Sequence, residues 1–170
     1  RQPLTHHVYK VRSGRGISSH QQNPFIALVD RSANELYGSC YGFALMYSGS
    51  FIAEVELDQY DQCRLVMGVN DRLFSYAVAP GEDFDTPAVL MNYTHKGLSR
   101  MSNNYHHFIR HNLNKSKFVR EVRRPVLINT WEAAFFDFDD EKIVEIAKAA
   151  KKMGVEMIVM DDGWFGKRDD

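Results

Sequence analysis

The chain has 170 residues, of which 44% are hydrophobic and 25% are charged, and its formal net charge is -1 at pH 7. This composition is typical of a globular protein and gives no reason to expect a nucleic-acid partner. Its apolar runs are far shorter than the ~20 residues that cross a bilayer, and no signal peptide is visible. We therefore expect a cytoplasmic protein without a membrane partner, and because the chain begins with Arg1 we expect its native N-terminus upstream.

The first part of the chain, residues 1–95, is predicted to be rich in β-strands. Short runs of β-branched and aromatic residues alternate with turn-forming residues, a spacing typical of a β-sandwich. One hairpin is predicted at Tyr47–Phe51, where Gly49 would take a positive φ between two apolar runs. The expected strands lie in six runs: 8–16, 25–30, 41–47, 51–57, 63–69 and 73–79.

Cys40 and Cys63 are the only cysteines. They could form one disulfide, but two thiols in a strand-rich chain without an export signal are more often buried and free. Neither lies beside a histidine that could activate it, so a cysteine nucleophile is not expected.

Residues 96–124 are predicted to form a connecting helix and a polar, basic linker. Apolar residues recur on one helical face at Leu98, Met101, Tyr105, Phe108, Ile109 and Leu113. His107 and His111 would be four residues apart on this helix, a spacing that can hold zinc. The intervening glutamate of zinc peptidases and a third ligand are missing, so we expect no metal.

Residues 125–170 are predicted to form a strand, a helix and a second, parallel strand. Pro125 can begin a strand, and the apolar run 126–128 after it is expected to be buried. Asp139 with its acidic neighbours predicts a helix N-terminus, and Gly154 suits the left-handed residue that ends a helix before the strand at 155–160. The expected inner face of the helix comprises Ile143, Val144, Ile146, Ala147, Ala150 and Met153.

Three polar or aromatic residues follow these two strands. Because parallel strands end at the same edge of a sheet, Trp131 and the pair Asp161 and Asp162 should lie near each other. The two carboxylates could be a solvated loop, a glycosidase acid and nucleophile, or a sugar-binding pair. Neighbouring strand residues point to opposite faces, whereas a retaining glycosidase needs carboxyl groups that converge at ~5 Å, so the second reading is disfavoured. Glu132 could hydrogen-bond a ligand or play a structural part.

Several long segments of the chain are distinctive. Two of them, NTWEAAFFDFDDEK and MDDGWFGKRDD, lie in the predicted strand-helix-strand part, and three others, SSHQQNPFIALV, MGVN and PGEDFDTPAVLMNYTHKGLSRMSNNYHHFIRHNL, precede it. Together they resemble bacterial α-galactosidases of glycoside hydrolase family 36. The first two are similar to the start of the catalytic barrel in that family, and the other three to the later part of its N-terminal β-sandwich. The distinctive run around His20 has no assignable chemical role.

The resemblance implies a multidomain β then α/β fold: a β-sandwich of the supersandwich type followed by the beginning of a (β/α)8 TIM barrel. Residues 1–95 would belong to the sandwich and 125–170 to the first βαβ unit. Because such a barrel takes roughly 250 residues, the chain is expected to continue, and alone it would be marginally stable.

The implied activity is retaining hydrolysis of terminal α-linked galactose from sugars of the melibiose and raffinose type. The resemblance implies that Asp161, Asp162 and Trp131 bind the galactose, that the catalytic nucleophile and acid/base lie beyond Asp170, and that neither a cofactor nor a metal is needed. It also implies a homo-oligomer. The alternative is a non-catalytic carbohydrate-binding or interaction module built on the sandwich.

Overall fold

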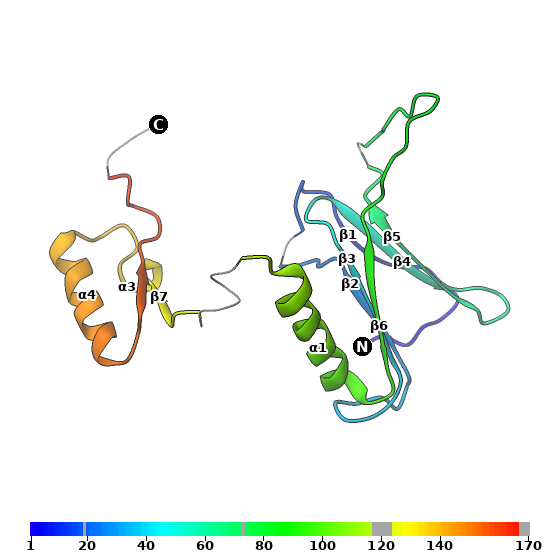
Figure 1. Ribbon diagram of the computed structural model, residues 1–170, viewed down its shortest axis with the longest axis horizontal. Helices are drawn as coiled ribbons and strands as arrows, with labels where there is room; N and C mark the ends of the chain where they lie inside the picture. Colours follow the sequence, from blue (N-terminus) through cyan, green and yellow to red (C-terminus); the bar gives the residue numbers. More distant parts are fainter. Residues whose placement is uncertain (19, 73, 117–123, 167–170) are drawn as a thin grey trace. The chain divides into compact units, whose positions relative to one another are not determined.

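The computed structural model describes residues 1–170 except 19, 73, 117–123 and 167–170. It divides into two compact units, Arg1–Arg110 and His111–Asp170, each of which is described by itself (Figure 1). Most of the predicted linker falls outside the described residues. Within the described residues, no helix is long and apolar enough to cross a membrane.

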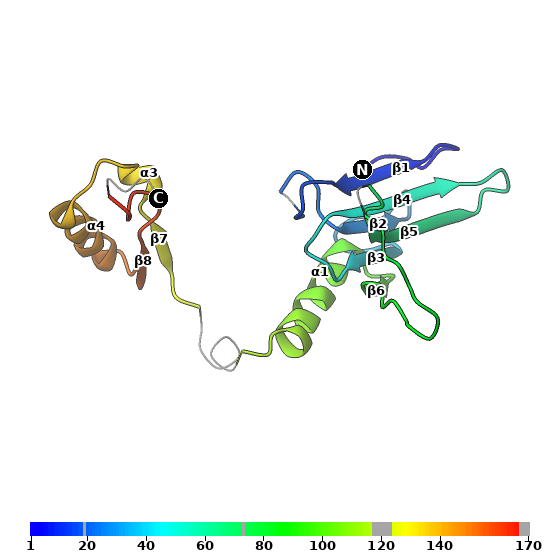
Figure 2. The ribbon, with the colours of Figure 1, turned by 90° about the horizontal axis from the view of Figure 1, so that it is seen from above.

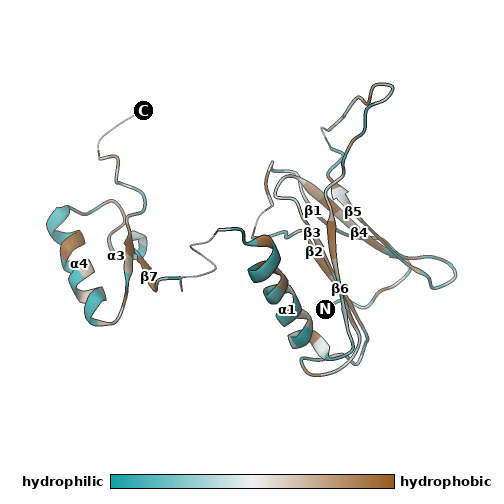
Figure 3. Cartoon of the chain, in the orientation of Figure 1, coloured by the Kyte–Doolittle hydropathy of each residue, from teal (hydrophilic) through white to brown (hydrophobic). Residues whose placement is uncertain are grey.

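The first unit contains two three-stranded antiparallel sheets. One has the strand order β1-β4-β5 and the other β2-β3-β6, so the β-rich prediction is confirmed. Hydrophobic residues concentrate in these strands (Figure 3). The strands are β1 (Tyr9–Ser13), β2 (Phe25–Val29), β3 (Cys40–Leu45), β4 (Phe51–Leu57), β5 (Cys63–Val69) and β6 (Val89–Thr94).

The predicted hairpin at Tyr47–Phe51 is wrong. β3 and β4, which flank it, belong to different sheets, so the segment carries the chain from one sheet to the other. Gly49 is not among the residues with positive φ. The Tyr47 side chain lies over Gly49 instead: a Cβ at Gly49 would lie 2.5 Å from the Tyr47 hydroxyl oxygen, so a larger residue would require this ring to shift. Between β4 and β5, the Asp58 carboxylate accepts hydrogen bonds from the backbone of Tyr60 and Gln62, which closes the hairpin that does form.

The described part of the run 73–79, which the sequence predicts to be a strand, does not form one. Conversely, the structure contains a strand, β6, that is absent from the six predicted runs. Phe74, Tyr76 and Val78 alternate as in a strand, yet all three are about half exposed. Tyr76 and Phe74 instead contact Phe84, with ring centroids 4.6 and 6.1 Å apart, so side-chain contacts hold this segment. The apolar alternation therefore reflects an aromatic cluster and not a hydrogen-bonded ladder.

Helix α1 (Gly97–Phe108) packs on β3 and β6, and a buried apolar cluster lies between this helix and the sheet. Cys40 and Met101 are buried there, and Tyr105 packs against them. Gly42 lets the helix approach closely, because a Cβ at this position would lie 2.6 Å from the Tyr105 hydroxyl oxygen. Cys40 is thus buried as expected, whereas Cys63 is exposed, and both are free thiols.

The predicted helix over 98–113 is confirmed, but its last turn differs. Residues Ile109–Leu113 form a π-helical turn, η1, whose wider winding breaks the 3.6-residue period. Ile109 and Leu113, expected on the buried face, are therefore 46% and 40% exposed.

The second unit is the predicted βαβ arrangement. Strand β7 (Leu127–Asn129) pairs in parallel with β8 (Met157–Val159), and helix α4 (Asp140–Lys152) connects them (Figures 1 and 2). A short helix, α3 (Trp131–Ala134), follows β7 where a loop was expected.

Both ends of α4 are formed as the sequence predicts. The Asp139 carboxylate accepts a hydrogen bond from the backbone N–H of Lys142 over 2.9 Å, which caps the helix N-terminus. Gly154 has a φ of 86° after the last turn, a conformation that glycine adopts without steric cost.

The burial expected in this unit is only partly correct. Ala150 is buried, and Ile143, Ile146 and Ala147 are partly buried, but Val144 and Met153 on the predicted inner face are 48% and 74% exposed. The strands, expected to be buried, also remain open, with Leu127 48% exposed. A two-stranded sheet with one covering helix protects only part of its surface, which explains the difference.

Candidate functional site

The carboxyl ends of β7 and β8 place the candidate residues at one edge of the sheet. In the parallel register Asn129 pairs with Val159, so Asp161 comes two residues after the paired position. The predicted parallel pairing, and with it the shared edge, is confirmed. The edge is therefore built by the last residues of two neighbouring strands and the loops that follow them.

Asn129 connects both halves of this edge. Its side-chain Nδ2 donates a hydrogen bond to Oδ2 of Asp161 over 2.6 Å. Its Oδ1 accepts one from the backbone N–H of Trp131 over 2.8 Å. The amide side chain of Asn129 thus contacts both the carboxylate of Asp161 and the backbone of Trp131.

Thr130 provides a second connection between the strand ends. Its side chain is almost fully buried, and its backbone N–H donates to the carbonyl oxygen of Val159 over 3.0 Å, which extends the ladder by one residue. Its hydroxyl oxygen accepts a hydrogen bond from the backbone N–H of Asp161 over 3.2 Å. The position of Asp161 is therefore defined through both its side chain and its backbone.

Trp131 begins α3 and contacts two aromatic rings. Its ring centroid lies 5.2 Å from that of Phe135 and 5.0 Å from that of Phe136, both in edge-on geometry. Phe135 has a φ of 47°, so the chain turns sharply there. The turn brings both phenyl rings against the indole, and Trp131 remains only partly buried.

The loop after β8 packs on the same aromatic segment. Gly163 has a φ of 96°, and a Cβ there would lie 3.0 Å from Cε1 of Phe138 and 3.4 Å from Cδ1 of Phe136. The positive φ favours glycine here, and a larger residue would also require the Phe138 ring to shift by a few tenths of an ångström. The close approach joins the loop that carries Asp161 and Asp162 to the segment that follows Trp131.

The chemistry of this edge suits a polyhydroxylated ligand. Asp161 is partly buried and Asp162 is exposed. Ionised carboxylates only accept hydrogen bonds and therefore match hydroxyl donors, while an indole can cover the apolar C–H face of a sugar ring. The backbone N–H of Asp162 donates to Oδ1 of Asp161 over 2.8 Å, so the two residues form one compact turn.

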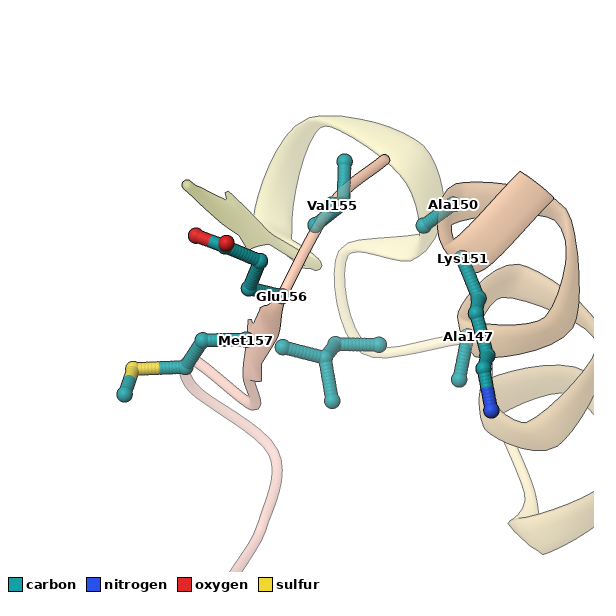
Figure 4. Close-up of a pocket in the computed structure, with 7 residues that line it drawn as sticks. Ala147, Ala150, Lys151, Val155, Glu156 and Met157 are labelled. Atoms are coloured by element: carbon teal, nitrogen blue, oxygen red, sulfur yellow. The ribbon is translucent and has the colours of Figure 1, made fainter. Parts of the chain in front are cut away.

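Other parts of the described chain offer weaker candidates. No group of three or more His, Cys, Asp or Glu side chains there could hold a metal ion. A pocket beside the start of β8 is lined mainly by small or apolar side chains of α4 and β8, together with Lys151 and Glu156 (Figure 4). It lies at the opposite end of β8 from the carboxyl edge. Glu132 and His20 are exposed.

The sequence pattern indicates Trp131, Asp161 and Asp162 as site residues, but it does not single out Asn129 or Thr130. Their position in the sequence could have indicated them, because Asn129 and Thr130 are the two residues between the predicted strand at 126–128 and Trp131. A polar pair at a strand end can bond across to the neighbouring strand's loop, but the partner depends on register.

Two protein-family models together match nearly the whole chain. Residues 1–79 match the glycosyl hydrolase family 36 N-terminal domain, and residues 83–170 match the melibiase family. The second match covers more than half of the chain and includes the whole carboxyl edge.

Individual relatives agree with the family models. The α-galactosidase AgaA of Geobacillus stearothermophilus is 51% identical over 170 residues, which are 100% of this chain and 23% of that protein. The bifunctional α-galactosidase/sucrose kinase AgaSK of Mediterraneibacter gnavus is 51% identical over 100% of this chain and 18% of its own length.

Solved structures give the same result. The crystal structure of AgaA superposes with a TM-score of 0.90 over 99% of this chain and 23% of that chain. A variant of AgaA in complex with raffinose superposes with a TM-score of 0.88 at 50% identity and the same coverage. The chain thus spans only 18% to 23% of the length of these relatives. The chain therefore belongs to the melibiase family, and its sequence joins a glycosyl hydrolase family 36 N-terminal domain to the start of a melibiase domain.

Proposed function

We propose that this chain is a segment of an α-galactosidase that releases terminal α-linked galactose from oligosaccharides of the melibiose and raffinose type. The observation that carries the proposal is the carboxyl edge of β7 and β8, where Trp131, Asp161 and Asp162 gather inside the melibiase match. A variant of AgaA whose structure was solved in complex with raffinose is 50% identical to this chain.

In this proposal the described edge binds the sugar and does not cleave it. Asp161 and Asp162 accept hydrogen bonds from galactose hydroxyls, and Trp131 lies against an apolar face of the ring. Adjacent carboxylates do not converge on one glycosidic bond, so a retaining mechanism requires a nucleophile and an acid/base from another part of the polypeptide. Those two groups are proposed to lie beyond residue 170.

The finer architecture is part of the same proposal. Residues 1–95 would belong to a β-sandwich of the supersandwich type, 96–124 to the connection, and 125–170 to the first βαβ unit of a (β/α)8 barrel. The antiparallel sheets followed by a parallel βαβ unit are compatible with that assignment. A homo-oligomeric, cytoplasmic enzyme without a cofactor stays a prediction.

The test compares the protein encoded by the complete gene with the 170-residue chain, using an aryl α-galactoside. We expect turnover by the complete protein only. Asp162→Asn should lower kcat/KM about 10- to 100-fold, the effect expected when a hydrogen bond to a charged group is lost. Glu145→Gln, which changes an exposed carboxylate on α4, is the matched control and should leave kcat/KM unchanged.

Two outcomes would contradict the proposal. Turnover by the 170-residue chain would mean that the cleaving residues are inside it. A complete protein that binds galactosides but never hydrolyses them would instead indicate a carbohydrate-binding module.

A further inference from the structure

We infer that Asn129 is a positioning residue that sets the orientation of the Asp161 carboxylate toward the sugar. Through its second hydrogen bond it also holds the backbone of Trp131 close to that carboxylate. The inference rests on the proposed galactose site and adds a residue to it. Asn129 is not itself required to touch the substrate.

The hydrogen bonds of Asn129 determine which way its amide faces. The backbone N–H of Trp131 can only donate, so the atom it meets at 2.8 Å must be the amide oxygen. The amide nitrogen is then directed at Oδ2 of Asp161, 2.6 Å away. The two contacts are mutually consistent only for an amide, because a carboxylate at this position would have no hydrogen to donate to Asp161.

The same contacts leave a defined acceptor pattern on Asp161. Its Oδ2 receives the Asn129 amide, and its Oδ1 receives the backbone N–H of Asp162 over 2.8 Å. Each carboxylate oxygen can accept about two hydrogen bonds. One acceptor site on each oxygen is therefore left for a ligand, which suits two hydroxyl groups on neighbouring carbons of a sugar.

The hydrogen bonds of Thr130 do not orient the carboxylate of Asp161. Thr130 fixes the backbone of Asp161 through the N–H, but a carboxylate can still rotate about its side-chain bonds. Among the hydrogen bonds of the described residues, the one from Asn129 is the only contact from β7 that restrains this rotation.

The experiment measures KM, kcat and inhibition by free galactose for the complete enzyme and two variants. Asn129→Leu removes both hydrogen bonds at similar size, and we expect KM and the galactose inhibition constant to rise about 10-fold while kcat changes less. Asn129→Asp keeps an acceptor for the Trp131 N–H but places a like charge beside Asp161. Its KM should rise more than that of Asn129→Leu.

The Asn129→Asp result separates positioning from a merely structural role, since a role limited to the Trp131 backbone would leave this variant with the wild-type KM.

Asn104→Leu is the matched control. Asn104 is an exposed asparagine in the other unit, and its Nδ2 donates a hydrogen bond to Asn92 over 3.1 Å. The KM of this variant should not change.

Wild-type KM and galactose inhibition in both Asn129 variants would overturn the inference and leave the proposed function intact. A wild-type enzyme with no α-galactosidase activity would instead remove the proposed function and this inference together. If Asn129→Leu does not fold, the Asn129→Asp variant decides alone, because its side chain has nearly the same shape as asparagine.

Discussion

The Thr130 hydroxyl accepts a hydrogen bond from the backbone N–H of Asp161 over 3.2 Å, which ties the end of one strand to the loop after its neighbour. Thr130 is 1% exposed, so water cannot easily replace the lost acceptor. Thr130→Val should destabilise this edge by about 1 kcal/mol, the net contribution of an ordinary hydrogen bond, because the donor residue Asp161 is only partly buried.

The measurement for Thr130→Val is hydrogen exchange at the Asp161 amide, which should become faster than in the unaltered chain. Thr130→Ser keeps the hydroxyl and should retain most of the protection. Equal exchange in all three proteins would show that the hydroxyl does not protect this amide.

The N-cap of α4 gives a second prediction. Asp139→Ala removes the acceptor for the Lys142 N–H and should destabilise the helix by about 1 kcal/mol. Exchange of the Lys142 amide should accelerate while amides in the middle of α4 change less. Asp139→Asn, which retains a capping oxygen, should behave like the unaltered chain, and equal acceleration in both variants would argue against the cap.

A third prediction concerns the start of α1. Gly97 has a φ of 75°, and a Cβ there would lie 2.5 Å from the carbonyl oxygen of Asn34 and 2.6 Å from the Tyr37 nitrogen. Because these are backbone atoms, Gly97→Ala should destabilise the first unit by about 2–4 kcal/mol, through a strained backbone conformation and a clash in a packed region. Gly68→Ala is the control, since a Cβ there meets nothing within 4 Å.

Urea unfolding followed by far-UV circular dichroism would compare the two glycine variants. A loss of stability for Gly68→Ala equal to that for Gly97→Ala would contradict the steric explanation.

The two thiols should react at different rates with iodoacetamide. Desolvation raises the pKa of both Cys40 and Cys63 above the ordinary value, so less thiolate is present near neutral pH and alkylation should speed up as the pH rises. Cys40 is buried in the core with Met101, whereas Cys63 is exposed at the start of β5. Exposure to the reagent therefore decides which thiol is alkylated first.

Mass spectrometry of the alkylated chain should find Cys63 modified first and Cys40 only after urea is added. Modification of Cys40 at the rate of Cys63 in native conditions would show that the core between α1 and the sheet opens readily.

Much of the secondary structure follows from local sequence. Asp139 and Gly154 mark the ends of α4 because capping and left-handed geometry depend on a few neighbouring residues. The described residues of the run 73–79 do not form the predicted strand; Phe74 and Tyr76 contact Phe84 instead of a partner strand, a difference that the local pattern does not contain.

The amino-acid sequence by itself determined the βαβ unit, the family and the three candidate sugar-binding residues, because strand ends, helix caps and long matching segments are local features. Only the tertiary structure decided that β3 and β4 belong to different sheets and that Asn129 and Thr130 contact Asp161. Residues 129 and 161 are far apart along the chain. Their contact exists because the parallel register pairs Asn129 with Val159, and a shift of one residue would turn the side chains to the other face.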